Sequence, residues 1–512
     1  MVLLQMKQGG FLIWARDPDL RFKALDIDHS PGKLSLRFQS HNHAPFDDSR
    51  TTTSVEWRIT PYKGDWRIGA ELYRKWLAQR FALTPLAQQT PAWAKDIRFL
   101  AITGMDADVI TELAKKVDPT RTMLYVPNWR NDRYDVNYPD YTASARFGPF
   151  VKVAHGLGFR VMPHVNYFGC DEKHPLYQRF SKYQLRSPHS DELQWWIPPR
   201  QRESGTTPTL KFAYIHPGCN EWRALLVERF RELVDTYGVD ALHLDQTLCI
   251  PNHSRGRVDG LTVPEGNLLL HRELRQAMPQ VALSGEGLNE VTTPYEAFAQ
   301  RHAGRAVDHV HGSWNETAIA YGHPISSYLF LPQTIINGYL GMTNPANEGL
   351  YRAWKRAYEH WGSIPTFARP SMAQLTSPSD EVALLLEEAA LWTTSALKPD
   401  FSGDWGDRTK FRWRGTDGVR VTMVGGPGNG SHGIVTDADG GPRELYRYVQ
   451  GATRHEGTTD IQGWVAFDDN GLFGLHPERT YLCSQRTRDP RVPHLSAIPE
   501  QAVIEEARRN ET

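Results

Sequence analysis

From about residue 95 onward, short apolar runs alternate with amphipathic stretches, and this alternation restricts the possible folds more than any other feature. Eight runs have strand length: Ile97–Ile102, Met123–Val126, Arg160–Val165, Ala241–Leu244, Val281–Leu283, Val307–His311, Ile335–Leu340 and Ile364–Phe367. Strands that alternate with helices build a parallel sheet, and eight such units predict a (β/α)8 TIM barrel. A doubly wound sheet is the alternative, but no Gly-rich phosphate loop follows the first run.

The flanks of the barrel have a different pattern. Residues 1–62 alternate apolar and polar side chains with period two, and Asp65 is placed to cap a helix that carries Ile68, Leu72 and Trp76 on one face. Near the end of the chain, strand-like runs flank turn sequences. We therefore predict an α/β protein with an N-terminal β-sandwich and linker helix over 1–90, the barrel over 91–395, a C-terminal β-domain over 396–500 and a polar tail over 501–512.

Composition excludes several classes of protein. The chain has 58 Lys and Arg against 59 Asp and Glu, so bulk charge gives no reason to expect nucleic acid as a partner. Without an apolar run of membrane-spanning length, no membrane association is expected. The four cysteines match no zinc pattern, and no metal or other cofactor is predicted. Without a visible signal peptide the chain reads as cytoplasmic, or as secreted if a leader was removed. Its oligomeric state stays open.

Two carboxylates directly follow neighbouring apolar runs, at the barrel end where active residues collect. Asp245 ends the fourth run and Glu286 lies between two glycines after the fifth. Adjacent strands lie about 4.8 Å apart, so these carboxylates are expected roughly 5–6 Å apart, which suits a retaining glycosidase. Asp245 could instead cap a helix or form an ion pair, and Glu290 competes with Glu286 for the role of acid/base.

The segment from Tyr237 to Gln246, with its Gly-Val-Asp and Leu-Asp-Gln elements, carries a resemblance. It looks like the fourth β–α unit of barrel glycoside hydrolases, and the layout is similar to the endo-α-N-acetylgalactosaminidase family and its uncharacterised glycosidase-like relatives. The resemblance implies that Asp245 is the nucleophile and Glu286 the acid/base. Amylase-type enzymes carry Arg where this chain has His243, and their third acid has no clear equivalent here, so amylase-like glucan specificity is not implied.

Further polar and aromatic groups at the predicted strand ends suit a sugar pocket. The candidate substrate-binding residues are Asn128, Trp129, His164, Asn166, His243, Asp308, His311, Trp195 and Trp196. The two tryptophans lie in a long insertion, residues 168–218, that either shapes the site or packs as a cover. The histidines His164, His309 and His311 could also be read as a metal cluster, but no convincing set of carboxylate ligands joins them.

We therefore expect a retaining hydrolase of α-glycosidic bonds that acts on an oligosaccharide or glycoside. Two alternatives stay open. In an α-galactosidase-like hydrolase, Asp308 at the predicted sixth strand would be the acid/base. In a catalytically inactive carbohydrate-binding barrel, neither acid would act. The sugar, the linkage, and endo or exo action cannot be read from the residues.

Overall fold

The structure is a computed structural model of the 512-residue chain, and it describes most residues up to 425. Outside the described residues lie 46–50, 86–90, 199–209, 248–251, 290–291, 302–306, 309–312, 315–324, 339–361 and 401–409, together with single positions and pairs at 7, 31–32, 41, 43, 52, 82, 84, 189 and 332. Beyond residue 425 the described residues are 431–436, 446–449, 467–468 and 471–472.

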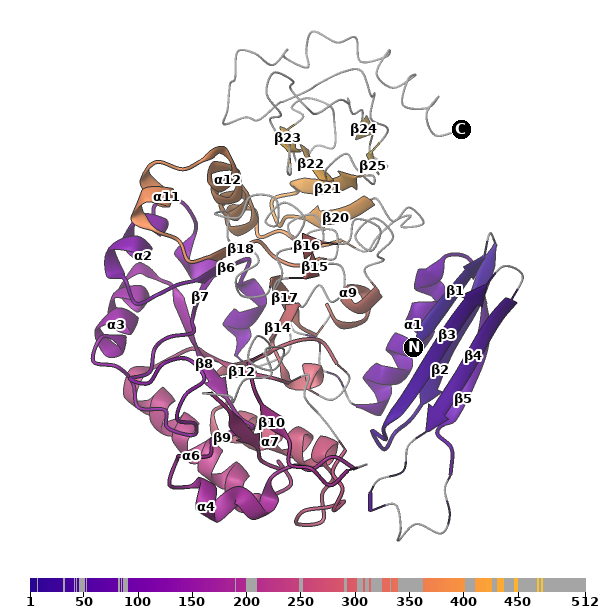
Figure 1. The fold of residues 1–512 in the computed structure, drawn as a ribbon. Helices are drawn as coiled ribbons and strands as arrows, with labels where there is room; N and C mark the ends of the chain where they lie inside the picture. The colour runs from indigo at the N-terminus through magenta and orange to yellow at the C-terminus, as the bar shows by residue number, and fades with distance from the viewer. Residues whose placement is uncertain are drawn as a thin grey trace.

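Eight parallel strands form the central sheet, as the alternating pattern predicted (Figure 1). They are β6 (Phe99–Ile102), β7 (Thr122–Val126), β8 (Arg160–Asn166), β12 (Ala241–Asp245), β13 (Ala282–Gly285), β14 (Phe298–Arg301), β17 (Ile335–Gly338) and β18 (Thr366–Ala368). Each pairs with its neighbours in chain order, and β18 pairs with β6. An isolated parallel bridge between Asn337 and Ile364 links the two remaining edges, so the sheet closes into a barrel.

Helices cover the outside of this barrel. They are α2 (Ala107–Leu113), α3 (Phe147–Leu157), α6 (Asn220–Tyr237), α7 (Val263–Ala277), α9 (Ile325–Phe330), α11 (Met372–Thr376) and α12 (Asp380–Thr394). Short 3₁₀ turns occur at η3 (Ala92–Asp96), η4 (Pro119–Arg121), η5 (Ser181–Tyr183) and η6 (Thr293–Tyr295). Helix α6 ends at Gly238, whose left-handed φ of 69° lets its N–H bond back to the carbonyl of Val234.

Side chains of each barrel strand alternate between two cores, because successive residues of a strand face opposite sides. In β12, Leu242 and Leu244 pack outward with the helices, whereas Ala241 belongs to the inner core. In β14 and β17, Phe298 and Ile335 are inner-core residues. Residues two positions further along these strands therefore also face the barrel interior.

The sixth barrel strand is β14, and the prediction that it spans Val307–His311 is wrong. Among the described residues of the connection from β13 to β14, the 3₁₀ turn η6 is found in place of the expected helix. Val307 and Asp308 form β15, which pairs antiparallel with β16 (Ser313–Trp314) and lies outside the barrel sheet. Asp308 therefore does not end a barrel strand.

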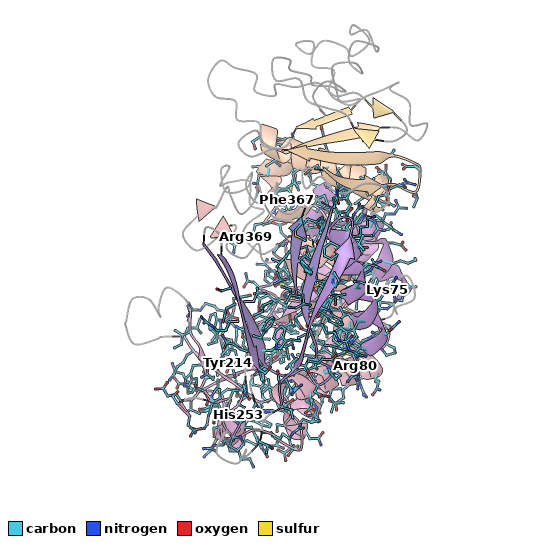
Figure 2. All side chains as sticks on the ribbon, turned by 90° about the vertical axis from the view of Figure 1, so that its right-hand side faces the viewer. Lys75, Arg80, Tyr214, His253, Phe367 and Arg369 are labelled. Carbon is cyan, nitrogen blue, oxygen red and sulfur yellow. The ribbon has the colours of Figure 1, made fainter. Side chains whose placement is uncertain are left out.

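The insertion after β8 forms a small antiparallel sheet with the order β10–β11–β9. Its strands are β9 (Gly169–Asp171), β10 (Trp195–Trp196) and β11 (Phe212–Tyr214), and the short helix α4 (Tyr177–Phe180) precedes β10. Figure 2, a view turned by 90° from that of Figure 1, shows Tyr214 and His253 at the end of the molecule opposite the C-terminal sheet.

The N-terminal region contains antiparallel strands and one helix. Strands β1 (Val2–Met6), β2 (Gly9–Arg16) and β5 (Glu56–Lys63) form one sheet, and β3 (Lys23–Ser30) and β4 (Lys33–Ser40) form a hairpin. Helix α1 (Trp66–Arg80) follows, capped by Asp65, whose side chain accepts from the Arg67 N–H as the sequence predicted.

The apolar stripe expected on α1 is not its buried face. Ile68 and Leu72 are 51% and 39% exposed, while the helix buries Trp66, Ala70, Tyr73 and Leu77 against β2 and α9. Ionic and polar contacts add to this packing. The Tyr328 hydroxyl of α9 donates to Glu71, and the Arg74 guanidinium lies 4.7 Å from the centre of the Tyr328 ring.

Antiparallel strands return after the barrel. Their order is β19 (Lys398–Pro399), β20 (Lys410–Arg414), β21 (Arg420–Gly425), β22 (Ser431–Thr436) and β23 (Tyr446–Val449), and β24 (Phe467–Asp468) pairs with β25 (Gly471–Leu472). Trp413 and Val421 join the inner core of the barrel, so this sheet covers the end of the barrel where the strands begin. Within the described residues, no helix has both the length and the apolar character needed to cross a bilayer.

Candidate active site

Asp245 is the last residue of β12 and faces the barrel interior, two residues beyond the inward His243. Its side chain is largely buried, with 7% of the residue exposed. In the sheet register Asp245 stands opposite Asn166, the last residue of β8. The Nδ2 of Asn166 donates to the Oδ2 of Asp245 over 2.9 Å.

The orientation of the Asn166 amide is fixed from its other end. Its Oδ1 accepts from the backbone N–H groups of Phe168 and Gly169, at 3.1 and 2.6 Å. Its own carbonyl accepts from the hydroxyl of Tyr141. Because Oδ1 of Asn166 already accepts two hydrogen bonds, the amide cannot flip, and its Nδ2 points at Asp245. The bond that Nδ2 donates favours the ionised form of the Asp245 carboxyl.

Glu286 extends the fifth strand by one residue, since its N–H bonds to the carbonyl of Leu244. Its Oε2 accepts from the backbone N–H of Gln246 over 2.8 Å. Gln246 reaches this contact with a φ of 63°, a conformation that costs free energy for a residue other than glycine. The strained turn after Asp245 therefore aims a backbone donor at Glu286.

Gly285 is required by a close approach behind Glu286. A Cβ at this position would lie 2.2 Å from the carboxylate oxygens of Glu296. Glu296 is fully buried and contacts His271 Nε2 at 3.3 Å, so it cannot easily move away. The end of β13 is thus tightly packed on the side away from the site.

The carboxyl groups of Asp245 and Glu286 are hydrogen-bonded to each other. Burial raises the pKa of Asp245 well above its ordinary value, and the neighbouring Glu286 charge raises it further. Two carboxylates this close cannot both ionise without large repulsion, so the pair holds a proton at pH values where isolated carboxyls have lost theirs. One acid and one base therefore stand side by side at the barrel mouth.

A third acid reaches the same place from the loop after β7. Asp135 is 6% exposed, and burial followed by the charge of Asp245 raises its pKa well above its ordinary value. Its φ of 61° turns the loop inward, and the Tyr138 hydroxyl donates to its Oδ1 over 3.4 Å. The adjacent Tyr134 ring lies over the His164 ring at 4.7 Å and closes this side of the site.

His164 lies beneath the acids and is neutral, because burial lowers its pKa well below the ordinary value and neighbouring positive charge lowers it further. Its Nδ1 contacts the Tyr125 hydroxyl at 2.8 Å and its Nε2 lies 3.8 Å from Asp245 Oδ2. In the tautomer in which Tyr125 donates, the proton on Nε2 faces Asp245. His243 also lies at this level, with Nδ1 3.0 Å from the Ser284 hydroxyl.

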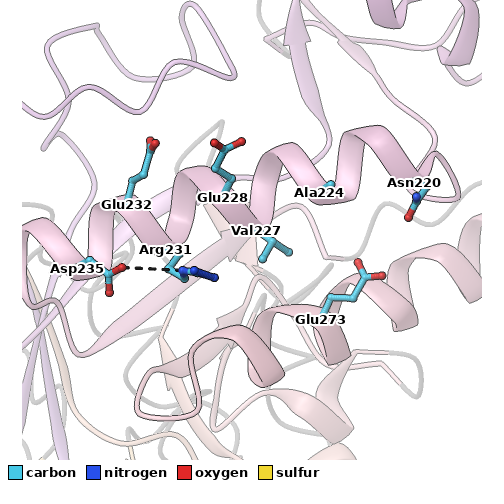
Figure 3. Close-up of a pocket in the computed structure, with 8 residues that line it drawn as sticks. All are labelled: Asn220, Ala224, Val227, Glu228, Arg231, Glu232, Asp235 and Glu273. Atoms are coloured by element: carbon cyan, nitrogen blue, oxygen red, sulfur yellow. Dashed lines mark ion pairs between the residues drawn. The ribbon is translucent and has the colours of Figure 1, made fainter.

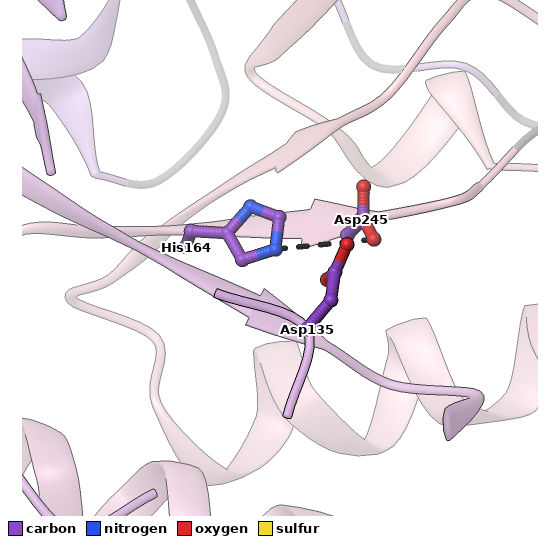
Figure 4. A group of neighbouring side chains, drawn as sticks. All are labelled: Asp135, His164 and Asp245. Atoms are coloured by element: carbon purple, nitrogen blue, oxygen red, sulfur yellow. Dashed lines mark ion pairs between the residues drawn. The ribbon is translucent and has the colours of Figure 1, made fainter. Parts of the chain in front are cut away.

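One ligand atom each from Asp135, His164 and Asp245 lie within 4.8 Å of one another (Figure 4). Such a group could hold a divalent cation, and it could equally be stabilised by a shared proton. The alternative metal cluster of His164 with His309 and His311 is not tested here, because His309 and His311 lie outside the described residues.

The other predicted residues are distributed differently. Trp129 is fully buried, packs on Phe147 and donates its indole N–H to the His164 carbonyl, so its geometry is structural. Asn128 is exposed. The Asp308 side chain, Glu290 and His311 lie outside the described residues.

Trp195 and Trp196 are both half-buried in the insertion. Trp196 stacks on the buried Phe212, with ring centres 4.9 Å apart and an interplanar angle of 6°. Trp195 contacts the Tyr177 ring, and the Lys211 ammonium lies 4.3 Å from its ring centre. The two rings therefore have different neighbours.

A groove of about 470 Å³ lies outside the barrel, between α6 and α7 (Figure 3). It is lined by Asn220, Ala224, Val227, Glu228, Arg231, Glu232, Asp235 and Glu273. No strand-end residue contributes to it. The groove is therefore separate from the carboxyl pair at the barrel mouth.

Sequence reasoning missed the part that Asp135 and Gln246 play in the site. In the sequence Asp135 lies beside Tyr134, Tyr138 and Tyr141, in a loop that is expected either to shape the site or to pack as a cover, and nothing in the loop identifies Asp135 as a third acid of the site.

Comparisons with known proteins bear on the fold. A family model described as a domain of unknown function, DUF6259, matches residues 52–299, a range that includes both Asp245 and Glu286. The curated proteins contain no match.

Solved structures are similar at low identity. The α-N-acetylgalactosaminidase NagBb from Bifidobacterium bifidum, in complex with GalNAc, is 13% identical, with a TM-score of 0.56 over 82% of this chain and 71% of that chain. The α-galactosidase TtGalA from Thermus thermophilus, in complex with p-nitrophenyl α-D-galactopyranoside, is 14% identical, with a TM-score of 0.50 over 79% of this chain and 77% of that chain. The chain thus has a fold found in barrel glycosidases.

Proposed function

We propose that this protein is a retaining hydrolase of α-glycosidic bonds, with Asp245 as nucleophile and Glu286 as general acid/base. The observation that carries the proposal is the hydrogen-bonded carboxyl pair at the ends of neighbouring strands. The proposal gains support from the barrel fold shared with an α-N-acetylgalactosaminidase and an α-galactosidase.

The two carboxyls differ in the way that this mechanism needs. Asp245 accepts from the oriented amide of Asn166, and the His164 imidazole lies nearby, so its anion has polar support. Glu286 is more exposed at the mouth of the barrel, where a leaving group would depart. In the first step Asp245 attacks the anomeric carbon while Glu286 gives its proton to the leaving oxygen. Glu286 then takes a proton from water, which cleaves the glycosyl–Asp245 ester.

Retention is proposed because the carboxyls are close. Inverting enzymes hold their carboxyls about 6.5–9.5 Å apart to leave room for water, and retaining ones about 5–5.5 Å apart. Asp245 and Glu286 follow neighbouring strands, and the charge of Glu286 acts on Asp245, so their carboxyls are too near each other to leave room for a water between them. Proton NMR of the first-formed sugar should show the α-anomer from an α-glycoside, whereas an initial β-anomer would contradict retention.

The activity is tested with a panel of p-nitrophenyl α- and β-glycosides that includes the α-galactoside and the α-N-acetylgalactosaminide. Release of nitrophenol from an α-glycoside by the wild type, and its loss in Asp245→Ala, supports the proposal. An inactive carbohydrate-binding barrel would release nothing from any member while still binding sugar. If Asp308→Ala, rather than Glu286→Ala, loses activity only on poor leaving groups, the acid/base is Asp308.

Turnover is expected without added metal, because proton sharing already accounts for the proximity of Asp135, His164 and Asp245. Dialysis against EDTA should leave kcat/KM unchanged. If activity were lost and one divalent ion restored it, Asp245 would be a metal ligand and the nucleophile assignment would fall.

A further inference from the structure

The two acids belong to a longer row of polar residues that crosses five neighbouring strands. Asn166 stands opposite Asp245 in the sheet register. Leu244 pairs with Gly285, so Asp245 faces Glu286 one residue later. Gly285 in turn pairs with Ala299, which sets Glu286 opposite Gln300.

Asn337 of β17 continues the row, since it is the register partner of Gln300. Neighbouring strands lie about 4.8 Å apart, so each member of the row is one strand spacing from the next. The order around the mouth is amide, acid, acid, amide, amide.

Gln300 and Asn337 face the inside of the barrel. Phe298 and Ile335, two residues earlier in β14 and β17, belong to the inner core. Because side chains alternate along a strand, Gln300 and Asn337 project to the same side. Each is only 1% exposed.

Both amides have an unused end, in contrast to Asn166. Among the residues that the structure describes, the Nε2 of Gln300 and the Oδ1 of Asn337 meet no hydrogen-bonding partner. The other end of the Asn337 amide donates to the Gly338 carbonyl over 3.1 Å. A buried amide without a partner costs free energy, and a bound ligand can supply the missing contacts.

The free groups are one donor and one acceptor on adjacent strands, and neither carries charge. A sugar hydroxyl accepts and donates, so two hydroxyls of one ring can take up both groups. A carboxylate or phosphate would meet only one donor here and would lie close to Glu286. The position next to Glu286 makes the ring that carries the scissile bond the natural occupant.

We propose that Gln300 and Asn337 bind hydroxyl groups of the sugar ring cleaved by Asp245 and Glu286, and thereby select that sugar. This inference rests on the proposed function for the identity of the ligand. It adds to the proposed function that residues of β14 and β17, on the side of Glu286 away from Asp245, determine which sugar is cleaved.

The test uses p-nitrophenyl α-D-galactopyranoside, or whichever α-glycoside of the panel is cleaved faster, together with its monodeoxy derivatives. Gln300→Met removes the donor while nearly keeping the shape, and Asn337→Leu removes the acceptor. Thr334→Val is the matched control, because Thr334 is also buried with an unpartnered hydroxyl but lies before β17, at the opposite end of the strand. Melting curves report on folding.

For the wild type, removal of one particular hydroxyl should lower kcat/KM by about 100-fold or more. Gln300→Met should lower kcat/KM for the parent substrate by about as much. For the derivative that lacks that one hydroxyl, Gln300→Met should have the same kcat/KM as the wild type. Asn337→Leu should behave likewise for a different hydroxyl, while Thr334→Val keeps the wild-type profile.

If both variants retain the wild-type ratios across the deoxy series, the specificity proposal is overturned while the hydrolase proposal stands. If the wild type neither cleaves nor binds any member of the panel, the hydrolase proposal fails and this inference fails with it.

Discussion

Two groups of acidic side chains among the described residues differ in their surroundings, and the group at the barrel mouth has the properties of a reactive site. At the barrel mouth, Asp135, Asp245 and Glu286 converge in buried surroundings. Along the groove between α6 and α7, four acids face solvent: Glu228, Glu232, Asp235 and Glu273 (Figure 3). The residue types are the same, and the difference lies in what surrounds them.

In the groove, Glu232 and Asp235 form exposed ion pairs with Arg229 and Arg231. Asp235 pairs with Arg231 at 3.9 Å, and their side chains are 67% and 59% exposed. Such exposed pairs contribute about 0–1 kcal/mol each. At the mouth, burial and the neighbouring negative charge instead raise the pKa of Asp135 and of Asp245 well above the ordinary value, so these carboxyls keep their protons to higher pH than exposed acids do. The two places differ in how far the acids are removed from water and in how strongly their charges act on one another, and not in the number of acids.

The largest contrast is expected from removing one acid at each place. Asp245→Ala should lower kcat/KM for an aryl α-glycoside by about 10³-fold or more, because no glycosyl-enzyme can form. Glu232→Ala in the groove should leave kcat/KM and the melting temperature unchanged. If the two variants lowered kcat/KM equally, the barrel mouth would not be the reactive site that distinguishes it from the groove.

Glu286→Ala should show a graded loss. Substrates with poor leaving groups need the proton of Glu286 and should slow by about 10²–10⁴-fold, whereas activated aryl glycosides should slow much less. Azide should partly restore turnover by attacking the glycosyl-enzyme in place of activated water. A uniform loss across leaving groups, without azide rescue, would assign Glu286 a structural part only.

Asp135→Asn should stabilise the protein at neutral pH. The pKa of Asp135 is raised in the folded state, so folding favours its protonated form. Its contribution to stability is therefore present below the unfolded pKa, near 3.8, and is lost as pH rises toward the folded value. The amide removes this loss, and the melting temperature at pH 7 should rise by about 2 °C or more.

The matched control for that change is Asp235→Asn in the exposed groove, which should leave the melting temperature at pH 7 unchanged because the side chain is 67% exposed. At pH 3 the wild type and Asp135→Asn should melt together. If Asp135→Asn destabilised the protein at pH 7, the carboxylate would be needed in its ionised form, as a cation ligand requires.

The smallest effects are expected in the insertion. Trp196→Ala should lower the free energy of unfolding by about 2–4 kcal/mol, because its ring stacks on the buried Phe212. Trp195→Ala should destabilise less and lower kcat/KM by about ten-fold if the Trp195 ring contacts the sugar. Should both variants alter only stability, the insertion is a structural cover.

Much of the barrel could be predicted from the sequence because its strands are apolar runs with clear ends. Asp245 and Glu286 directly follow such runs, so their convergence required only the rule that parallel strands end at one edge. The sixth strand was not predicted because Phe298–Arg301 is short and includes the polar residues Gln300 and Arg301, and because the described residues before it form a 3₁₀ turn rather than a helix.

The position of Asp135 and the buried face of α1 could not be predicted, because both depend on contacts that no local pattern in the sequence contains. Asp135 enters the site because its loop turns inward and is held by Arg130, whose guanidinium donates to the Val136 and Asp140 carbonyls and lies 4.2 Å from the centre of the Tyr138 ring. On α1, the stripe of Ile68 and Leu72 faces solvent because β2 and α9 pack against the opposite face. Tertiary packing decided both outcomes.

The central claim is that Asp245 forms a covalent bond to the sugar while Glu286 handles the protons. Its most direct test is mass spectrometry of Glu286→Ala after rapid mixing with an activated aryl α-glycoside, since the glycosyl-enzyme should accumulate when its hydrolysis is slow. The account predicts an added mass of one glycosyl unit on the peptide that contains Asp245, and its disappearance on addition of azide. A glycosyl adduct on another residue, or turnover with no adduct at any time, would contradict it.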